Sequence, residues 1–219
     1  MLSEILYAQT VSLWEEAAEK PFVTAMALGT LDRRRFRRYM LQDYLYLRDY
    51  IDILDRTLEY TSDPELSSFL CDVIEETKKE AERVHISNLR KEGLQEADLK
   101  DCVMEDVIVE YLDYMKQELE EEGLLAGLTA LLQCSWVYAY IAQTVRDRYP
   151  GEVTGSPFRD WFESYTCEDY LLSNQRWIDV LNREAAGISR DERDRLCVVF
   201  RTCAYYENRL WDRLNELPV

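Results

Sequence analysis

Apolar residues along this chain follow the period of an α-helix, and no segment sustains the alternation of apolar and polar residues that marks a half-buried β-strand. The segment at residues 124–149, LLAGLTALLQCSWVYAYIAQTVRDRY, shows the helical period clearly. At that spacing one face carries Gly127, Leu131, Cys134, Tyr138, Ile141 and Val145. This face must point into a core, so a thiol and a phenol are expected one turn apart. A buried cysteine is most often a small apolar residue that only fills space. Whether Cys134 has a chemical role depends on which residues the other helices place near it.

Capping residues divide the chain into helices, most of which are followed by glycine or proline. Helix starts are indicated by Asp32, by Asp63 before Pro64, by Ser156 before Pro157, and by Ser189 with Glu192. These signals predict a short segment at 22–28 and helices at residues 3–20, 33–61, 64–92, 99–122, 124–149, 156–162, 166–186 and 189–214. We therefore predict an all-α fold of seven or eight helices, in one domain that spans residues 1–219.

Composition excludes several classes of partner. Seven Gly and five Pro are few for 219 residues, which suits long amphipathic helices rather than loops or disorder. The net charge of −17 repels polyanions, so no nucleic-acid partner is expected. The arginine-rich run at residues 33–38 is a local exception. It fits a phosphate or nucleic-acid patch, or else a solvated helix face or a docking surface for an acidic neighbour. We favour a solvated face or a docking surface.

The cysteine pattern indicates a reducing compartment. Six cysteines occur without a C-x-x-C pair or the short spacings of a disulfide framework. The first helix contains acidic residues and does not resemble a secretory signal, so a cytoplasmic location is expected. No uncharged run is expected to be long enough to span a bilayer, so no membrane partner is predicted.

A single histidine, His85, limits metal and triad chemistry. Together with Glu82 it matches half of the Glu-x-x-His motif of helical di-iron proteins, which need such a pair from each of two helices. The surrounding segment is highly charged, so we interpret His85 as part of an exposed helix face. A histidine-rich metal site is therefore not expected.

Two carboxylic acids fall on apolar helix faces. Asp43 lies among aromatic residues at helical spacing, and Glu207 lies between Cys203 and Leu210. A buried acid is costly unless it is paired or bound to something. Each acid is therefore either part of a structural hydrogen bond or a group of shifted pKa that is available for acid–base chemistry.

Tyrosine supplies further candidates, with fifteen residues against six phenylalanines. Tyr111 and Tyr114 lie three residues apart on one predicted helix, and Tyr165 lies between two others. Several phenols around one cavity suit a planar aromatic ligand with polar edges. The alternative is that tyrosines fill the core while their hydroxyl groups reach the surface.

Six segments of the chain, taken in order, resemble the TenA or thiaminase II family, whose members have the haem-oxygenase-like helical fold. The segments are KPFV at 20–23, GTL at 29–31, FRRYMLQDYLYL at 36–47, QCSWVY at 133–138, WFESY at 161–165 and YENRLWD at 206–212. Two departures are Gln133, where the family commonly has Pro, and Lys20, where it commonly has His.

The resemblance implies a role for seven residues. It makes Cys134 the nucleophile, Glu207 the catalytic acid, and Asp43 the group that holds the amino group and a ring nitrogen of the substrate. It places four tyrosines around the pocket, namely Tyr46, Tyr111, Tyr138 and Tyr165.

The reaction implied by the resemblance is hydrolysis of an aminomethyl aminopyrimidine to the hydroxymethyl compound, with release of ammonia, for thiamin salvage. Thiamin itself is a further possible substrate. The resemblance also implies a homotetramer without cofactor. Two alternatives remain: a non-catalytic protein of the same fold that binds a small ligand or acts as a regulatory partner, and a haem- or metal-dependent oxidase, which the single histidine disfavours.

Overall fold

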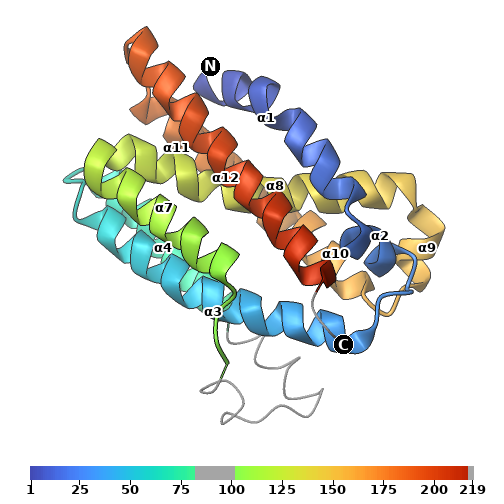
Figure 1. The fold of residues 1–219 in the computed structure, drawn as a ribbon. Coiled ribbons are helices and arrows are strands. Elements are labelled where there is room, and N and C mark those ends of the chain that lie inside the picture. The colour runs from blue at the N-terminus through green and yellow to red at the C-terminus, as the bar shows by residue number, and fades with distance from the viewer. Residues whose placement is uncertain (82–101, 217–219) are drawn as a thin grey trace.

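The structure is a computed structural model that describes residues 1–81 and 102–216, and over these ranges it contains ten α-helices and no β-strand (Figure 1). The helices are α1 (Leu2–Glu19), α2 (Pro21–Ala27), α3 (Arg33–Leu58), α4 (Pro64–Glu80), α7 (Asp106–Glu122), α8 (Leu124–Arg148), α9 (Pro150–Gly155), α10 (Arg159–Thr166), α11 (Glu168–Glu184) and α12 (Arg190–Glu216). The prediction of an all-α fold is confirmed. The helix count is slightly above seven or eight because α2 and α9 lie where short connections were expected.

Three of the predicted helix starts are confirmed by their caps. Asp32 accepts a hydrogen bond from the backbone N–H of Arg34 at 2.7 Å, and Asp63 accepts one from that of Glu65 at 3.0 Å. At the start of α12, the backbone N–H of Ser189 donates to Glu192 at 2.8 Å, while the backbone N–H of Glu192 donates back to the Ser189 hydroxyl at 3.2 Å. These contacts satisfy N–H groups that have no partner inside the helix.

Two predicted boundaries are wrong because distant side chains hold the backbone. Residues 102–105 are not helical, and α7 begins at Asp106 rather than near residue 99. The side-chain amide of Gln42 on α3 donates to the carbonyl of Val103 at 2.9 Å and accepts from the N–H of Glu105 at 2.8 Å. Likewise, the Ser156 hydroxyl donates to the carbonyl of Met26 at 2.6 Å. The helix predicted at residues 156–162 therefore runs from 159 to 166 instead.

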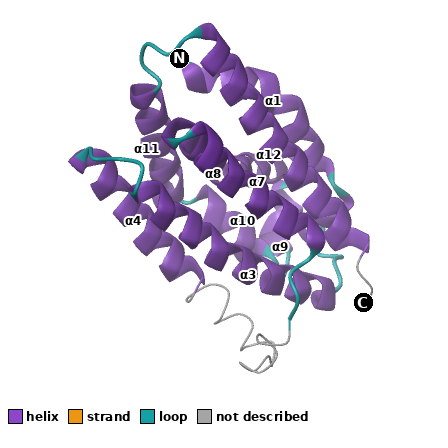
Figure 2. Ribbon diagram, turned by 60° about the vertical axis from the view of Figure 1, so that its left-hand side comes forward, coloured by secondary structure: helices purple, strands orange, loops and turns teal. Residues whose placement is uncertain are grey.

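The helix α8 runs through the middle of the bundle and packs against α1, α7, α10, α11 and α12. Figure 2 shows α1 and α12 on one side of it and α4 and α11 on the other. At 25 residues, α8 is long and apolar enough to cross a membrane, which corrects the expectation that no run approached that length. Most of that stretch is buried inside the protein, so α8 is a core helix.

The link between α7 and α8 depends on two glycines. Gly123 has φ of +86°, a conformation that side chains rarely adopt, and it joins the two helices without any further loop residue. A Cβ atom at Gly127 would come within 2.6 Å of Leu119 Cδ1 on α7. The two glycines thus let α7 pack closely along α8 and bring Tyr111 toward Cys134.

Buried apolar side chains from all ten described helices form one cluster. That continuity is what a single domain requires, although the extent of the domain over residues 1–219 stays a prediction. The predicted helix at 64–92 is confirmed as far as Glu80, and the residues from 82 onward, including His85, lie outside the described ranges.

Candidate active site

A cavity of about 620 Å³ lies between α3, α4, α8, α10 and α11. Its wall is mostly aromatic and carries several acidic groups. The polar, charged and aromatic side chains that line it include Asp43, Tyr46, Tyr50, Glu76, Glu80, Cys134, Ser135, Tyr138, Tyr165, Tyr170 and Arg176. Asp169 and Leu172 are exposed and mark the rim of the cavity. A volume of this size suits a small planar ligand.

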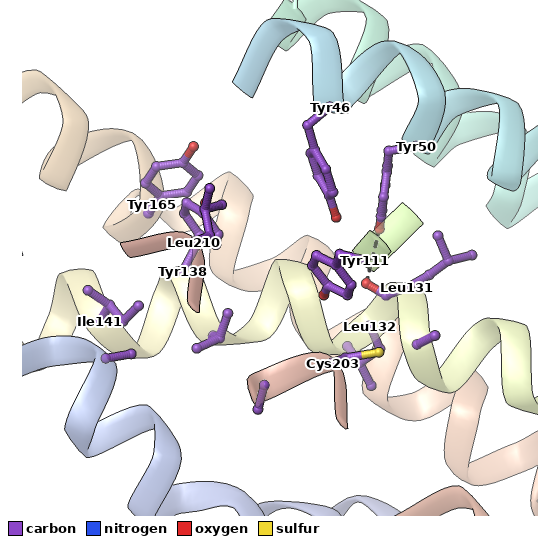
Figure 3. Close-up of a cluster of buried hydrophobic side chains, with 14 of the residues drawn as sticks. Tyr46, Tyr50, Tyr111, Leu131, Leu132, Tyr138, Ile141, Tyr165, Cys203 and Leu210 are labelled. Carbon is purple, nitrogen blue, oxygen red and sulfur yellow. Dashed lines mark hydrogen bonds between the residues drawn. The ribbon is translucent and has the colours of Figure 1, made fainter. Parts of the chain in front are cut away.

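The structure brings all seven predicted site residues together. Five of them line the cavity, namely Asp43, Tyr46, Cys134, Tyr138 and Tyr165. The other two, Tyr111 and Glu207, are buried next to Cys134. Figure 3 shows Tyr46 pointing from α3 toward Tyr111, while Tyr138 and Tyr165 lie together further along α8.

Cys134 keeps its proton in the free protein. Its side chain is partly accessible through the cavity, yet protein atoms enclose it, and this burial raises the pKa of the thiol well above its usual value. The negative charge of Glu207 raises that pKa further, whereas a hydrogen bond with Tyr46 opposes the rise. A thiolate therefore forms at this position only when a nearby group accepts the proton of the thiol.

Glu207 is that acceptor. The residue is 1% exposed, and burial raises the pKa of its carboxyl to about 8, with hydrogen bonds to Tyr111 and Cys134 as opposing influences. Its Oε2 has no hydrogen-bond partner among the described residues.

Gln133 fixes the direction of the hydrogen bond that Tyr111 makes. The Tyr111 hydroxyl donates to Gln133 Oε1 at 3.0 Å, and both side chains are buried. A phenol has one hydrogen to give, so Gln133 and the Glu207 carboxylate compete for the hydrogen of Tyr111. Gln133 therefore weakens the hydrogen bond through which Tyr111 lowers the pKa of Glu207. Helix α8 also continues unbroken through this position.

Asp43 is held by two aromatic residues. The Tyr39 hydroxyl donates to Asp43 Oδ2 at 3.3 Å and accepts from the indole N–H of Trp161 at 2.9 Å. Burial raises the pKa of Asp43 well above its usual value, and the charges of Glu80 and Glu207 raise it further. A neutral acid in this place can donate one hydrogen bond and accept another.

Glu80 is a site residue that the sequence analysis missed. It lines the cavity from α4, and its Oε1 accepts a hydrogen bond from the Tyr165 hydroxyl at 3.3 Å. Burial raises the pKa of this carboxyl to about 7. The spacing of Val73, Thr77 and Glu80 puts all three on one face of the helix, and this signal could have indicated an inward-facing acid.

The helix turn that carries Cys134 is also anchored to α11. The Ser135 hydroxyl donates to Asn174 Oδ1 at 2.8 Å, and the Tyr170 hydroxyl donates to the Ser135 carbonyl at 3.0 Å. On the other side, the Tyr50 hydroxyl donates to the carbonyl of Leu131 at 3.0 Å. These bonds fix the backbone on both sides of the thiol.

Metal ligands do not gather at this site. Over residues 1–81 and 102–216, no group of three or more His, Cys, Asp and Glu side chains is placed to hold a metal ion. The six cysteines are all free.

The arrangement of helices is that of the haem-oxygenase-like fold. A domain of unknown function from Shewanella denitrificans, described as having a heme oxygenase-like fold, is similar with a TM-score of 0.77 and 14% identity, and the match covers 99% of this chain and 92% of that one. More specifically, residues 7–216 match the model of the TENA/THI-4/PQQC family, and the chain belongs to this family.

Individual relatives match along most of their length. The aminopyrimidine aminohydrolase of Halalkalibacterium halodurans is 26% identical over 94% of this chain and 92% of its own length, and that of Helicobacter pylori is 25% identical over 96% and 97%. A TenA homologue from P. horikoshii OT3 is 24% identical, with a TM-score of 0.82 over 98% of both chains.

Proposed function

We propose that this protein hydrolyses an aminomethyl-substituted aminopyrimidine to the hydroxymethyl compound and releases ammonia, as a step of thiamin salvage. The observation that carries the proposal is the contact between Cys134 and Glu207 at the wall of a cavity that also contains Asp43. The names of the Halalkalibacterium and Helicobacter relatives agree with this activity.

The cavity can hold the substrate ring by its polar edge. Asp43 in its neutral form donates to a ring nitrogen and accepts from the neighbouring amino group, which matches the hydrogen-bonding pattern of an aminopyrimidine. The flat faces of Tyr46, Tyr138 and Tyr165 pack against the ring. Binding of this kind orients the reacting ring carbon toward Cys134.

Proton transfer between Cys134 and Glu207 prepares both groups for the reaction. At a pH near 8, a large share of Glu207 is ionised because its pKa is about 8. This carboxylate takes the proton of the Cys134 thiol, and one transfer thereby creates the nucleophile and the acid.

The thiolate then adds to a ring carbon, and Glu207 gives its proton to a ring nitrogen. Electrons from the ring expel the ammonium group on the neighbouring methylene as ammonia. Water adds to that methylene, and its proton returns to Glu207. The sulfur then leaves the ring as a thiolate and takes up the nitrogen-bound proton. This step restores the aromatic ring and the Cys134 thiol and leaves the hydroxymethyl product.

Ammonia release from the purified protein tests the proposal. The aminomethyl aminopyrimidine, thiamin and a degraded thiamin relative should be offered in turn, with ammonia and the hydroxymethyl product measured together. We expect equal amounts of both from at least one of them. No ammonia from any compound would contradict the proposal.

A second candidate function is ligand binding without turnover. The observation that favours it is the raised pKa of Cys134, since a thiol that never ionises does not attack. This candidate predicts that the same compounds raise the melting temperature of the protein while releasing no ammonia.

We also propose a homotetramer in the cytoplasm. Val198 and Tyr205 lie two turns apart on α12 and are 53% and 57% exposed, and Tyr7 on the neighbouring α1 is 37% exposed. Apolar side chains exposed in this way are suited to contacts between subunits. Light scattering distinguishes a tetramer from a monomer.

A further inference from the structure

The wall of the cavity carries more acid than base. Four acidic side chains line it, namely Asp43, Glu76, Glu80 and Asp169, whereas Arg176 is the one basic residue among the described lining side chains. Arg176 is already engaged, because it donates to Asp72 at 3.1 Å and its guanidinium lies 5.4 Å from the centre of the Phe69 ring. The described wall therefore favours a ligand that brings positive charge of its own.

Glu80 is the acid best placed to meet that charge. The phenols of Tyr165 and Tyr170 lie close to it, and over residues 1–81 and 102–216 neither Lys nor Arg forms an ion pair with it. Its charge acts on Asp43 and on Cys134, which places it close to the two groups expected to hold and attack the substrate. A buried carboxylate without a cation is costly, and a cationic ligand removes that cost when it binds.

Tyr165 sets the position of this carboxyl. Its hydroxyl donates to Glu80 at 3.3 Å, and its ring lies 5.0 Å from the ring of Tyr138, which lines the same cavity. Glu80 is thus fixed beside the aromatic surfaces that would pack against a pyrimidine. A substituent on that pyrimidine can reach the carboxyl while the ring remains bound.

We propose that Glu80, positioned by Tyr165, binds the ammonium group of the substrate's aminomethyl substituent and so makes the site select a charged amine over a neutral substituent. This inference rests on the proposed function and adds a specificity-determining residue to it. An amine held as ammonium leaves as ammonia without needing a further proton. The hydroxymethyl product is neutral, lacks the ion pair with Glu80 and is therefore released more readily.

Binding to a variant without the thiol tests this inference apart from turnover. In a Cys134→Ala background, calorimetry at pH 8 compares the aminomethyl aminopyrimidine with its hydroxymethyl counterpart. Adding Glu80→Gln should raise the Kd of the aminomethyl compound by on the order of tenfold, as expected for the loss of one charge-assisted hydrogen bond. The Kd of the hydroxymethyl compound should change less than about twofold, since it brings no charge to Glu80.

Glu75→Gln is the matched control, because Glu75 lies on the same helix, is exposed, and is not among the residues that line the cavity. It should leave both Kd values nearly unchanged. If Glu80→Gln does not fold, Tyr165→Phe removes the hydroxyl that holds Glu80, and a several-fold loss confined to the aminomethyl compound is expected.

Three outcomes overturn the inference. An equal weakening of both compounds means that Glu80 only shapes the cavity. Unchanged binding of the aminomethyl compound means that Glu80 does not contact it. If neither compound binds to the Cys134→Ala protein, the proposed function fails as well.

Discussion

The carboxyl of Glu207 on α12 lies against the thiol of Cys134 on α8, and burial keeps a proton on both groups at neutral pH. After the loss of one proton, the pair exists either as thiol and carboxylate or as thiolate and carboxylic acid, and both forms contain the same number of protons. The reactive form, thiolate and carboxylic acid, is the minor one because the pKa of the thiol lies well above that of the carboxyl. The pH dependence of the rate therefore belongs to the pair.

The first prediction concerns the rate profile of the wild-type protein. The pair must lose one proton before it can react, and that proton leaves the free protein with a pKa of about 8, so kcat/KM should rise as the pH passes through about 8. The rate should fall only at much higher pH, where the second proton is lost. A bell-shaped rate profile that falls near pH 8 would mean that the reaction requires Glu207 to be protonated before the thiol loses its proton, and this result would contradict the prediction.

Replacing Glu207 by Gln keeps the size of the side chain and removes the acid. We expect kcat to drop by on the order of a hundredfold or more and the rise through about pH 8 to disappear. Rates measured from pH 6 to 10 check this. If the variant keeps most of its rate and both limbs, Glu207 is a structural buried acid.

The bond from Tyr111 to Gln133 predicts a shift in that same limb. Gln133→Leu keeps a similar volume but removes the acceptor, so the Tyr111 hydroxyl becomes free to donate to the Glu207 carboxylate. A donor to the charged form lowers a pKa, and the rising limb should move below pH 8. A limb that does not move would show that Gln133 has only a packing role.

Stability should also depend on Glu207. The pKa of its carboxyl is about 8 in the folded protein and near 4.5 when unfolded, so its contribution is fully present below about pH 4.5 and is lost as the pH rises through about 8. Wild-type protein should lose on the order of a few kcal/mol between pH 5 and pH 8 from this group. Urea unfolding at both pH values should show a smaller loss in Glu207→Gln.

The hydroxyl of Tyr39 predicts an effect on binding rather than on chemistry. Tyr39→Phe removes the group that donates to Asp43, while the ring and its packing remain. KM for the aminopyrimidine should rise by roughly tenfold with a smaller change in kcat, because one buried hydrogen bond to a binding group is lost. Tyr60→Phe, at an exposed position, is the control. A fall in kcat alone would contradict the positioning role of Tyr39.

Local signals in the sequence predict those structural features that depend on residues close together in the chain. Asp32, Asp63 and the pair Ser189 and Glu192 cap helices through contacts within three residues, so their positions were readable from the sequence. The acids Asp43 and Glu207 were also found, because an acid on an apolar face stands out at helical spacing.

Contacts between distant segments could not be read in the same way. The start of α7 depends on Gln42, which lies about sixty residues earlier in the chain. From the sequence, no uncharged run is expected to be long enough to span a bilayer. The helix α8 is nevertheless long and apolar enough to do so, and only its packing shows that it is a core helix. Glu80 was missed because the segment around it is highly charged, and only the fold shows that this acid faces Tyr165.

Ammonia release by wild-type protein and by Cys134→Ser tests the central claim most directly. Both should be offered the aminomethyl aminopyrimidine at pH 8, with Cys71→Ser as a control at an exposed cysteine outside the cavity. We predict that wild type and Cys71→Ser release ammonia and hydroxymethyl product in equal amounts, while Cys134→Ser folds normally and turns over more than about a hundredfold more slowly. Near-normal turnover by Cys134→Ser would contradict the covalent mechanism.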